Sequence, residues 1–399
     1  MNKLYCRLYQ QTMKMVVPFM PWRKPELLEG EGSLLNLPAL IREKGIFTVL
    51  VVTDKGISSL GLMNPLLEKM REEGIGFTVY DETVPNPTID NIEEALIRYK
   101  GNKCEGIIAF GGGSSMDCAK GVGARVARPG KPVEKMKGLI KIRKALPPLF
   151  AIPTTAGTGS ETTLAAVITN SKTHEKYPIN DWVLIPRYAV LDPAITVGLP
   201  PHITSTTGMD ALTHAVEAYI GRSNTKETRQ MAITATKLIF GNVYKAFADG
   251  SNLEARRNMQ LAAFYAGVAF TRAYVGYVHA IAHTLGGFYG VPHGLANAVI
   301  LPYVLEQFGE PANKPLAELA DAVGITEPSD TREQKARKFI DAVKEFNRSM
   351  NIPDKIVEIQ EADIPTLVER AHKEANPLYP VPRLMEKDEF MDIYHLIMA

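Results

Sequence analysis

The stretch GIIAFGGGSSMDCAK, residues 106–120, runs from a short apolar segment through a glycine loop into the start of a predicted helix. Similar apolar runs occur at 47–53, 77–80 and 149–152. The first of these is almost unbroken and rich in β-branched residues, as expected for a strand that is buried on both faces. A helix is predicted over 89–99, between two of the runs. This alternation of strand and helix favours an α/β fold with a parallel sheet.

The pattern changes after the double proline at 200–201, where long amphipathic segments replace the strand-like runs. Helices are predicted over 204–220, 225–248, 252–286, 294–308 and 331–350. Capping boxes are predicted for two of them, at Asn224 with Glu227 and at Ser251 with Glu254. The double proline therefore predicts a boundary between an α/β domain over 1–200 and an all-α helical domain over 201–399.

Bulk composition excludes several classes of function. The 399 residues hold 45 Lys plus Arg against 44 Asp plus Glu, so the net charge of +1 gives no reason to expect nucleic acid or an anionic membrane as a partner. Three scattered cysteines are too few for a disulfide framework. No segment approaches the roughly 20 apolar residues that span a bilayer. We expect a cytoplasmic protein.

Five residues of the second half have the side chains and the spacing of a metal site: Asp210, His214, His279, His283 and His293. Residues four apart on a helix share a face, so each helical pair can point at one centre. Imidazole and carboxylate groups together suit zinc or ferrous iron. The alternative is a set of local polar pairs. However, the surrounding residues are apolar, so unshared imidazoles would carry a desolvation cost that a common metal removes. Spacing alone leaves open which four of the five bind.

The glycine loop at 111–114 is a candidate phosphate site. Glycine allows close backbone approach, and a helix that begins there offers unpaired N–H groups. Ser114 and Asp117 match a capping box. The loop has neither the G-x-G-x-x-G nor the P-loop fingerprint, and a turn that needs glycine for geometry alone is the alternative. A second small-residue loop at 154–161 follows another predicted strand, which strengthens the nucleotide interpretation.

Asp54 ends the first predicted strand. A carboxylate there can accept hydrogen bonds from ribose hydroxyls and would repel a 2′-phosphate. It can equally cap the next helix, and the two roles are compatible.

These motifs, in this order, resemble the iron-containing (group III) alcohol dehydrogenases of the dehydroquinate synthase-like superfamily. The resemblance runs from about residue 28 to the C-terminus and includes 111–120, 153–161, 208–219 and 266–297. It implies metal ligation by Asp210, His214, His279 and His293, and it leaves His283 as a catalytic second-sphere histidine that relays a proton. The bound metal would be Fe²⁺ or Zn²⁺.

The resemblance also implies a cofactor site for NAD rather than NADP. The residues that match it are Asp54, Asn86, Gly112, Gly113, Ser114, Asp117, Thr154, Thr155, Thr163 and Lys176. The implied reaction is hydride transfer between the nicotinamide and a primary alcohol or aldehyde. The alternatives are a dehydroquinate synthase-type lyase or cyclase and a glycerol dehydrogenase-like polyol oxidoreductase. We expect a small-molecule substrate and a homo-oligomer, with a dimer favoured.

The chain departs from the family pattern in three places. Residues 1–27 form a longer N-terminal extension than is usual. Arg272 and Tyr274 stand where the family usually has asparagine and a small residue. Ala165 replaces a side chain that is polar in members that act on diols. The last two changes concern the substrate pocket.

Overall fold

The computed structural model describes residues 2–173 and 175–399, which form two compact units. The α/β unit is Pro21–Gly198, and the helical unit is Leu199–Ala399 together with the residues up to Met20. The first helix, α1 (Lys3–Val16), therefore groups with the helical unit, whereas the sequence analysis placed residues 1–27 in the α/β domain.

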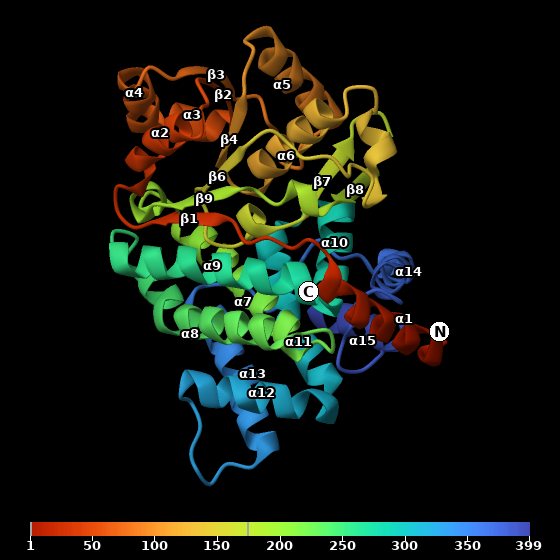
Figure 1. Cartoon of the computed structure of the whole chain (residues 1–399). Coiled ribbons are helices and arrows are strands. Elements are labelled where there is room, and N and C mark those ends of the chain that lie inside the picture. Colours follow the sequence, from red (N-terminus) through yellow and green to blue (C-terminus); the bar gives the residue numbers. More distant parts are fainter. Residues whose placement is uncertain (1, 174) are drawn as a thin grey trace. The chain divides into compact units, whose positions relative to one another are not determined.

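A six-stranded parallel sheet forms the centre of the α/β unit, with the strand order β1-β9-β6-β4-β2-β3 (Figure 1). Its strands are β1 (Glu26–Glu29), β2 (Thr48–Val52), β3 (Gly76–Tyr80), β4 (Gly106–Gly111), β6 (Leu149–Pro153) and β9 (Tyr188–Leu191). The four apolar runs of the sequence are β2, β3, β4 and β6, so the predicted parallel sheet is confirmed.

Helices cover both faces of this sheet. They are α2 (Ser33–Glu43), α3 (Lys55–Ser59), α4 (Asn64–Glu72), α5 (Ile89–Gly101) and α6 (Gly113–Ala127). Successive strand residues point to opposite faces. In β2, Leu50 and Val52 join the core beneath α5 and α6, while Val49 and Val51 join the core beneath α2 and α4. This burial on two sides explains why the strand is apolar throughout.

From β2 the chain continues to β3 at the edge of the sheet and then returns to β4 on the other side of β2. The strand order therefore reverses between β2 and β4. Ligands in open α/β sheets bind at the carboxyl ends of the strands beside such a switch point. The glycine loop follows β4 and Asp54 follows β2, so both lie at this position. A second, mixed sheet of β5 (Gly138–Leu139), β8 (Glu175–Asn180) and β7 (Ala165–Asn170) completes the unit.

The helical unit consists of α1 and of the helices that follow residue 200. These are α7 (Pro201–Ile220), α8 (Lys226–Ala248), α9 (Leu253–Ala273), α10 (Tyr277–Tyr289), α11 (His293–Phe308), α12 (Glu310–Val323), α13 (Arg332–Ser349), α14 (Ile364–Ala375) and α15 (Lys387–Ile397). The predicted all-helical half is confirmed, apart from one isolated bridge between Ile356 and Met398. No helix in the described ranges is long and apolar enough to cross a membrane.

Three local predictions in this half were wrong. The expected helix over 252–286 is two helices, α9 and α10, separated at 274–276. The cap of α8 is Thr225, which pairs reciprocally with Thr228, and not Asn224. The cap of α9 is Asn252 and not Ser251.

Candidate functional site

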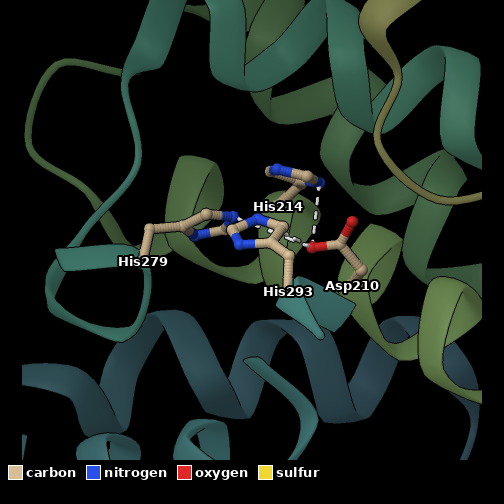
Figure 2. Close-up of side chains that lie close together, drawn as sticks. All are labelled: Asp210, His214, His279 and His293. Atoms are coloured by element: carbon tan, nitrogen blue, oxygen red, sulfur yellow. Dashed lines mark ion pairs between the residues drawn. The ribbon is translucent and has the colours of Figure 1, made fainter. Parts of the chain in front are cut away.

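Four of the five candidate ligands converge within the helical unit. Asp210 and His214 come from α7, His279 from α10 and His293 from the first residue of α11. One ligand atom from each lies within 4.8 Å of every other (Figure 2). His283 is outside this group. Three helices therefore bring together the ligand set that the family resemblance implies.

The spacing of the donor atoms fits a single ion. Oδ1 of Asp210 lies 3.9 Å from Nδ1 of His214, 3.9 Å from Nε2 of His279 and 3.6 Å from Nε2 of His293. Donors around a tetrahedral ion at zinc–nitrogen distance lie about 3.4 Å from one another. The three separations from Asp210 exceed this by about half an ångström or less, and every other pair of donors lies within 4.8 Å, so modest side-chain movements would complete the coordination.

Burial keeps the imidazoles in the form that binds metal. It lowers the pKa of His214 to about 4 and the pKa of His279 well below its usual range, so both rings are neutral near pH 7. Burial opposes ionisation of Asp210, but the neighbouring histidines and Asn297 outweigh it and lower the pKa of that carboxyl. Within the described residues, the buried Nδ1 of His214 has no hydrogen-bond partner. A metal would satisfy this atom.

Sequence reasoning missed Glu217, which supports the site from α7. Its Oε2 accepts a hydrogen bond from Nδ1–H of His279 at 2.6 Å. The bond places the proton of His279 on Nδ1 and directs the lone pair of Nε2 toward Asp210. Glu217 lies seven residues after Asp210 and thus on the same helix face, which is the signal that could have identified it.

Glu217 also explains the break between α9 and α10. Its carboxylate accepts hydrogen bonds from the backbone N–H groups of Gly276, at 2.7 Å, and Val278, at 2.8 Å. A Cβ on residue 276 would lie 2.7 Å from Oε1 of Glu217, so the contact requires glycine. The same carboxylate therefore begins α10 and orients its metal ligand.

Asn297 is a second residue that sequence reasoning missed. It lies one turn after His293 on α11 and is fully buried. Its side-chain Nδ2 donates to Oδ1 of Asp210 at 2.7 Å and lies 3.2 Å from Nε2 of His279 and 3.1 Å from Nε2 of His293. The amide thus holds the donor atoms of three helices in one place.

His283 lies beside the cluster. Its ring stacks against that of His293 with centroids 5.4 Å apart, and its side chain is 40% exposed. Nδ1 of His283 lies 2.6 Å from Oε1 of Glu374 on α14. The position suits a group that exchanges protons with solvent.

The glycine loop of the α/β unit joins several of the predicted cofactor residues. Gly112 is the residue that precedes the first turn of α6. Ser114 Oγ accepts a hydrogen bond from the backbone N–H of Asn86 at 3.2 Å, and Oδ1 of Asn86 accepts from Nζ of Lys176 at 2.6 Å. A Cβ on Gly113 would come within 3.3 Å of the second loop at Thr158, so this loop leaves little room for a side chain there.

The predicted capping role of Asp117 with Ser114 was wrong. The partly buried carboxylate of Asp117 instead accepts hydrogen bonds from Oγ–H of Ser160 at 3.1 Å and from the backbone N–H of Val167 at 3.0 Å. Burial raises the pKa of this carboxyl. Asp117 therefore fastens α6 to the second loop and to β7.

Lys120 strengthens the same connection. It is fully buried, and its Nζ donates to Ser160 Oγ at 3.0 Å, to Thr163 Oγ1 at 2.8 Å and to the carbonyl of Ala165 at 2.8 Å. Burial lowers the pKa of Lys120 to about 8. The hydroxyl of Thr163, a predicted cofactor residue, therefore accepts a hydrogen bond from Lys120 inside the α/β unit.

The remaining predicted cofactor residues lie at the carboxyl ends of β6 and β2. The backbone N–H of Thr154 donates to the carbonyl of Gly111 at 3.1 Å, and Thr155 faces Gly112. Asp54 caps α3 by accepting from the backbone N–H of Ile57 at 3.0 Å. Its other oxygen accepts from the hydroxyl of Ser115 at 3.3 Å, which brings the ends of β2 and β4 together.

Comparison with known proteins agrees with this arrangement. Residues 25–193 match the family described as iron-containing alcohol dehydrogenase, and residues 204–398 match the C-terminal part of the Fe-containing alcohol dehydrogenase family. The 1,3-propanediol dehydrogenase of Citrobacter freundii is 39% identical over 350 residues, which cover 86% of this chain and 90% of the relative.

Two solved structures are similar over nearly their whole length. A 1,3-propanediol oxidoreductase is 36% identical, with a TM-score of 0.90 over 94% of this chain and 98% of the other. Sulfoacetaldehyde reductase from Bifidobacterium kashiwanohense, solved in complex with NAD⁺, is 28% identical, with a TM-score of 0.85 over 95% and 99%. The chain therefore belongs to the iron-containing alcohol dehydrogenase family and is an oxidoreductase with a divalent metal site at Asp210, His214, His279 and His293.

Proposed function

We propose that the protein is a metal-dependent, NAD(H)-linked dehydrogenase that interconverts a primary alcohol and its aldehyde. The observation that carries the proposal is the Asp210–His214–His279–His293 cluster, buried except at His293, in a chain of this family. When bound, the metal supplies Lewis-acid polarisation of the substrate oxygen and the nicotinamide supplies the hydride chemistry.

The ligand set suits a catalytic ion better than a structural one. Three neutral imidazoles and one carboxylate leave a divalent ion with a net positive charge, whereas structural zinc sites are usually closed by several thiolates. His293 is the most open ligand, with a side chain that is 39% exposed. This side of the cluster is where a substrate oxygen could enter. The charge and the opening together favour Lewis-acid chemistry.

His283 is the group we assign to proton transfer. Its Nδ1 faces the carboxylate of Glu374, so the proton of the neutral ring sits on Nδ1 and Nε2 carries the lone pair. Oxidation of an alcohol requires that the hydroxyl proton leave, and a half-exposed imidazole beside a metal ligand can accept it and pass it to water.

We assign the cofactor to the carboxyl ends of β2, β4 and β6. The loop at Gly112, Gly113 and Ser114 offers backbone N–H groups at the start of α6 for a pyrophosphate. Asn86 and Lys176 lie beside it, and Asp54 would accept from the ribose hydroxyls. The NAD⁺ complex of the sulfoacetaldehyde reductase supports the choice of cofactor.

For the substrate we propose an aliphatic or aromatic alcohol rather than a small polyol. The ring of Phe270 stacks on His214 with centroids 4.0 Å apart, so one ligand is backed by an apolar wall. Arg272 lies near this ring in the sequence, but its guanidinium pairs with Glu227. An apolar surface beside the metal favours a substrate with an apolar chain.

Metal analysis combined with kinetics tests the proposal. Purified protein is assayed for iron and zinc, and NADH absorbance is followed with ethanol, benzyl alcohol, glycerol and the corresponding aldehydes. Chelation should abolish turnover, and Fe²⁺ or Zn²⁺ should restore it. Full turnover in protein shown to be metal-free would contradict the proposal. Glycerol as the best substrate would contradict its substrate class alone.

A further inference from the structure

The N-terminal helix α1 lies before residue 25, where the match to the iron-containing alcohol dehydrogenase family begins. Its solvent side carries exposed apolar residues, but its inner side buries the amide of Gln10, which is 5% exposed. Buried amides are held by hydrogen bonds to specific partners. The partners of Gln10 therefore indicate what α1 does in the helical unit.

Two side chains of α1, Gln10 and Arg7, hold the backbone of the loop at 377–382. Nη1 of Arg7 also donates to Oε1 of Gln10 at 2.8 Å, so the two act as one unit. The loop acceptors are the carbonyls of Pro377 (3.1 Å) and Tyr379 (2.8 Å) for Gln10 and those of Val381 (2.8 Å) and Pro382 (3.0 Å) for Arg7. Four carbonyls of a loop that is neither helix nor strand are thus fixed by one helix.

Tyr379 connects this loop to the site. Its hydroxyl donates to Oε1 of Glu374 at 2.8 Å. The same oxygen lies 2.6 Å from Nδ1 of His283. The backbone of Tyr379 is held on one side by Gln10 of α1, through its carbonyl, and on the other by its own N–H, which donates to the carbonyl of Ala375 at 2.7 Å.

Glu374 is ionised near neutral pH. Burial opposes this, but His283 and the hydroxyl of Tyr379 outweigh it and lower the pKa of the carboxyl. An ionised carboxylate accepts a hydrogen bond from Nδ1–H of His283 and so selects one tautomer and one ring orientation.

We propose that α1 is a positioning element for His283: through Gln10 and Arg7 it fixes the 377–382 loop, so that Tyr379 and Glu374 hold His283 with its proton on Nδ1. The importance of this for turnover rests on the proposed role of His283 in proton transfer. The hydrogen-bonded chain itself lies wholly within the helical unit.

Ring ¹⁵N shifts of His283 test the proposal without depending on activity. They are measured in protein labelled at histidine, with the His283 signals assigned by their loss in His283→Asn. In Gln10→Ala and in Tyr379→Phe, the shifts should move from a pure Nδ1–H tautomer toward a mixture. We expect kcat to fall by about tenfold or more, while bound metal and the KM for cofactor stay unchanged.

Gln11→Ala is the matched control, because Gln11 is the next residue of α1 and is exposed. It should leave both the shifts and kcat at wild-type values. If Gln10→Ala does not fold, Gln10→Met keeps roughly the side-chain volume and removes the amide, that is, both the donor to the loop and the acceptor for Arg7. Unchanged His283 shifts in folded Gln10 and Tyr379 variants would overturn the proposal. Absence of any dehydrogenase activity would instead count against the proposed function, since the shifts would still report the positioning.

Discussion

The carboxylate of Glu217 accepts a hydrogen bond from Nδ1–H of His279 at 2.6 Å, and it also accepts hydrogen bonds from the two backbone N–H groups of Gly276 and Val278 at the start of α10. Glu217 is 4% exposed, and burial raises its pKa to about 7. One acidic side chain on α7 therefore determines both where the helix that carries His279 starts and which nitrogen of that ring faces the metal site.

Glu217→Gln is expected to weaken metal binding. The carboxylate accepts hydrogen bonds from three donors, namely two backbone N–H groups and Nδ1–H of His279. Glutamine replaces one of its oxygens by an NH₂ group, which cannot accept a hydrogen bond, so the orientation of His279 is lost. We expect a loss of metal affinity of about tenfold to a hundredfold, measured by competition with a chromophoric zinc chelator. Glu318→Gln removes a carboxylate that pairs with Arg229 in the same unit and should leave the affinity unchanged. Equal affinities in the two variants would contradict the role of Glu217.

Asp54 has a structural role as a cap and a proposed role in cofactor choice, and two substitutions separate them. Asp54→Asn keeps an oxygen that can accept from Ile57 N–H, whereas Asp54→Ala removes it. We expect Asp54→Ala to lose about 1 kcal/mol of stability and Asp54→Asn to lose little. Both remove the charge that would repel a 2′-phosphate, so both should narrow the preference for NAD over NADP.

The preference between cofactors is measured as the ratio of kcat/KM for NAD to kcat/KM for NADP. The change in stability is measured by urea unfolding. Selectivity that is unchanged in both variants would leave Asp54 as a cap alone.

The parts of this protein that could be predicted from the sequence depend on local patterns. Burial of β2 on both faces makes every residue from Val49 to Val52 apolar, so the strand is visible without its neighbours. The four-residue spacing of Asp210 and His214 likewise follows from helix geometry alone. The family resemblance then separated His283 from the ligands, as the geometry does.

The parts that could not be predicted depend on contacts between distant residues. Glu374 lies 91 positions from His283, and no periodicity links them. The break before α10 exists because Gly276 packs against Glu217, 59 positions earlier. Neighbouring Asn224 and Thr225 can both cap a helix. The Asn224 amide instead donates to the carbonyls of Tyr219 and Gly221, contacts that the local pattern does not predict, and Thr225 accepts the hydrogen bond from Thr228 N–H.

Glu161 should make the stability of the α/β unit depend on pH. Burial raises the pKa of this carboxyl from 4.5 to about 7, so the folded protein binds more protons than the unfolded chain between these values. The contribution to stability is complete below pH 4.5 and is lost as the pH rises through 7, with a size on the order of 3 kcal/mol.

Glu161→Gln removes this titration and should flatten the profile. The free energy of unfolding is measured by hydrogen exchange of β6 amides, corrected for the intrinsic effect of pH on exchange. Glu68→Gln, at an exposed position of α4, should keep the wild-type slope. A slope that persists in Glu161→Gln would assign the effect to another group.

Tyr274, at the end of α9, adopts φ 69° and ψ 172°, a backbone conformation that is populated almost only by glycine. Tyr274→Gly and Tyr274→Ala both remove the side chain, so the difference between them isolates the backbone strain. We expect the glycine variant to be the more stable by about 1–3 kcal/mol in urea unfolding. At Gln11, an exposed position within α1, the order should be reversed, because glycine costs about 1 kcal/mol relative to alanine in a helix. An alanine variant as stable as the glycine variant at position 274 would show that the loop before His279 relaxes without strain.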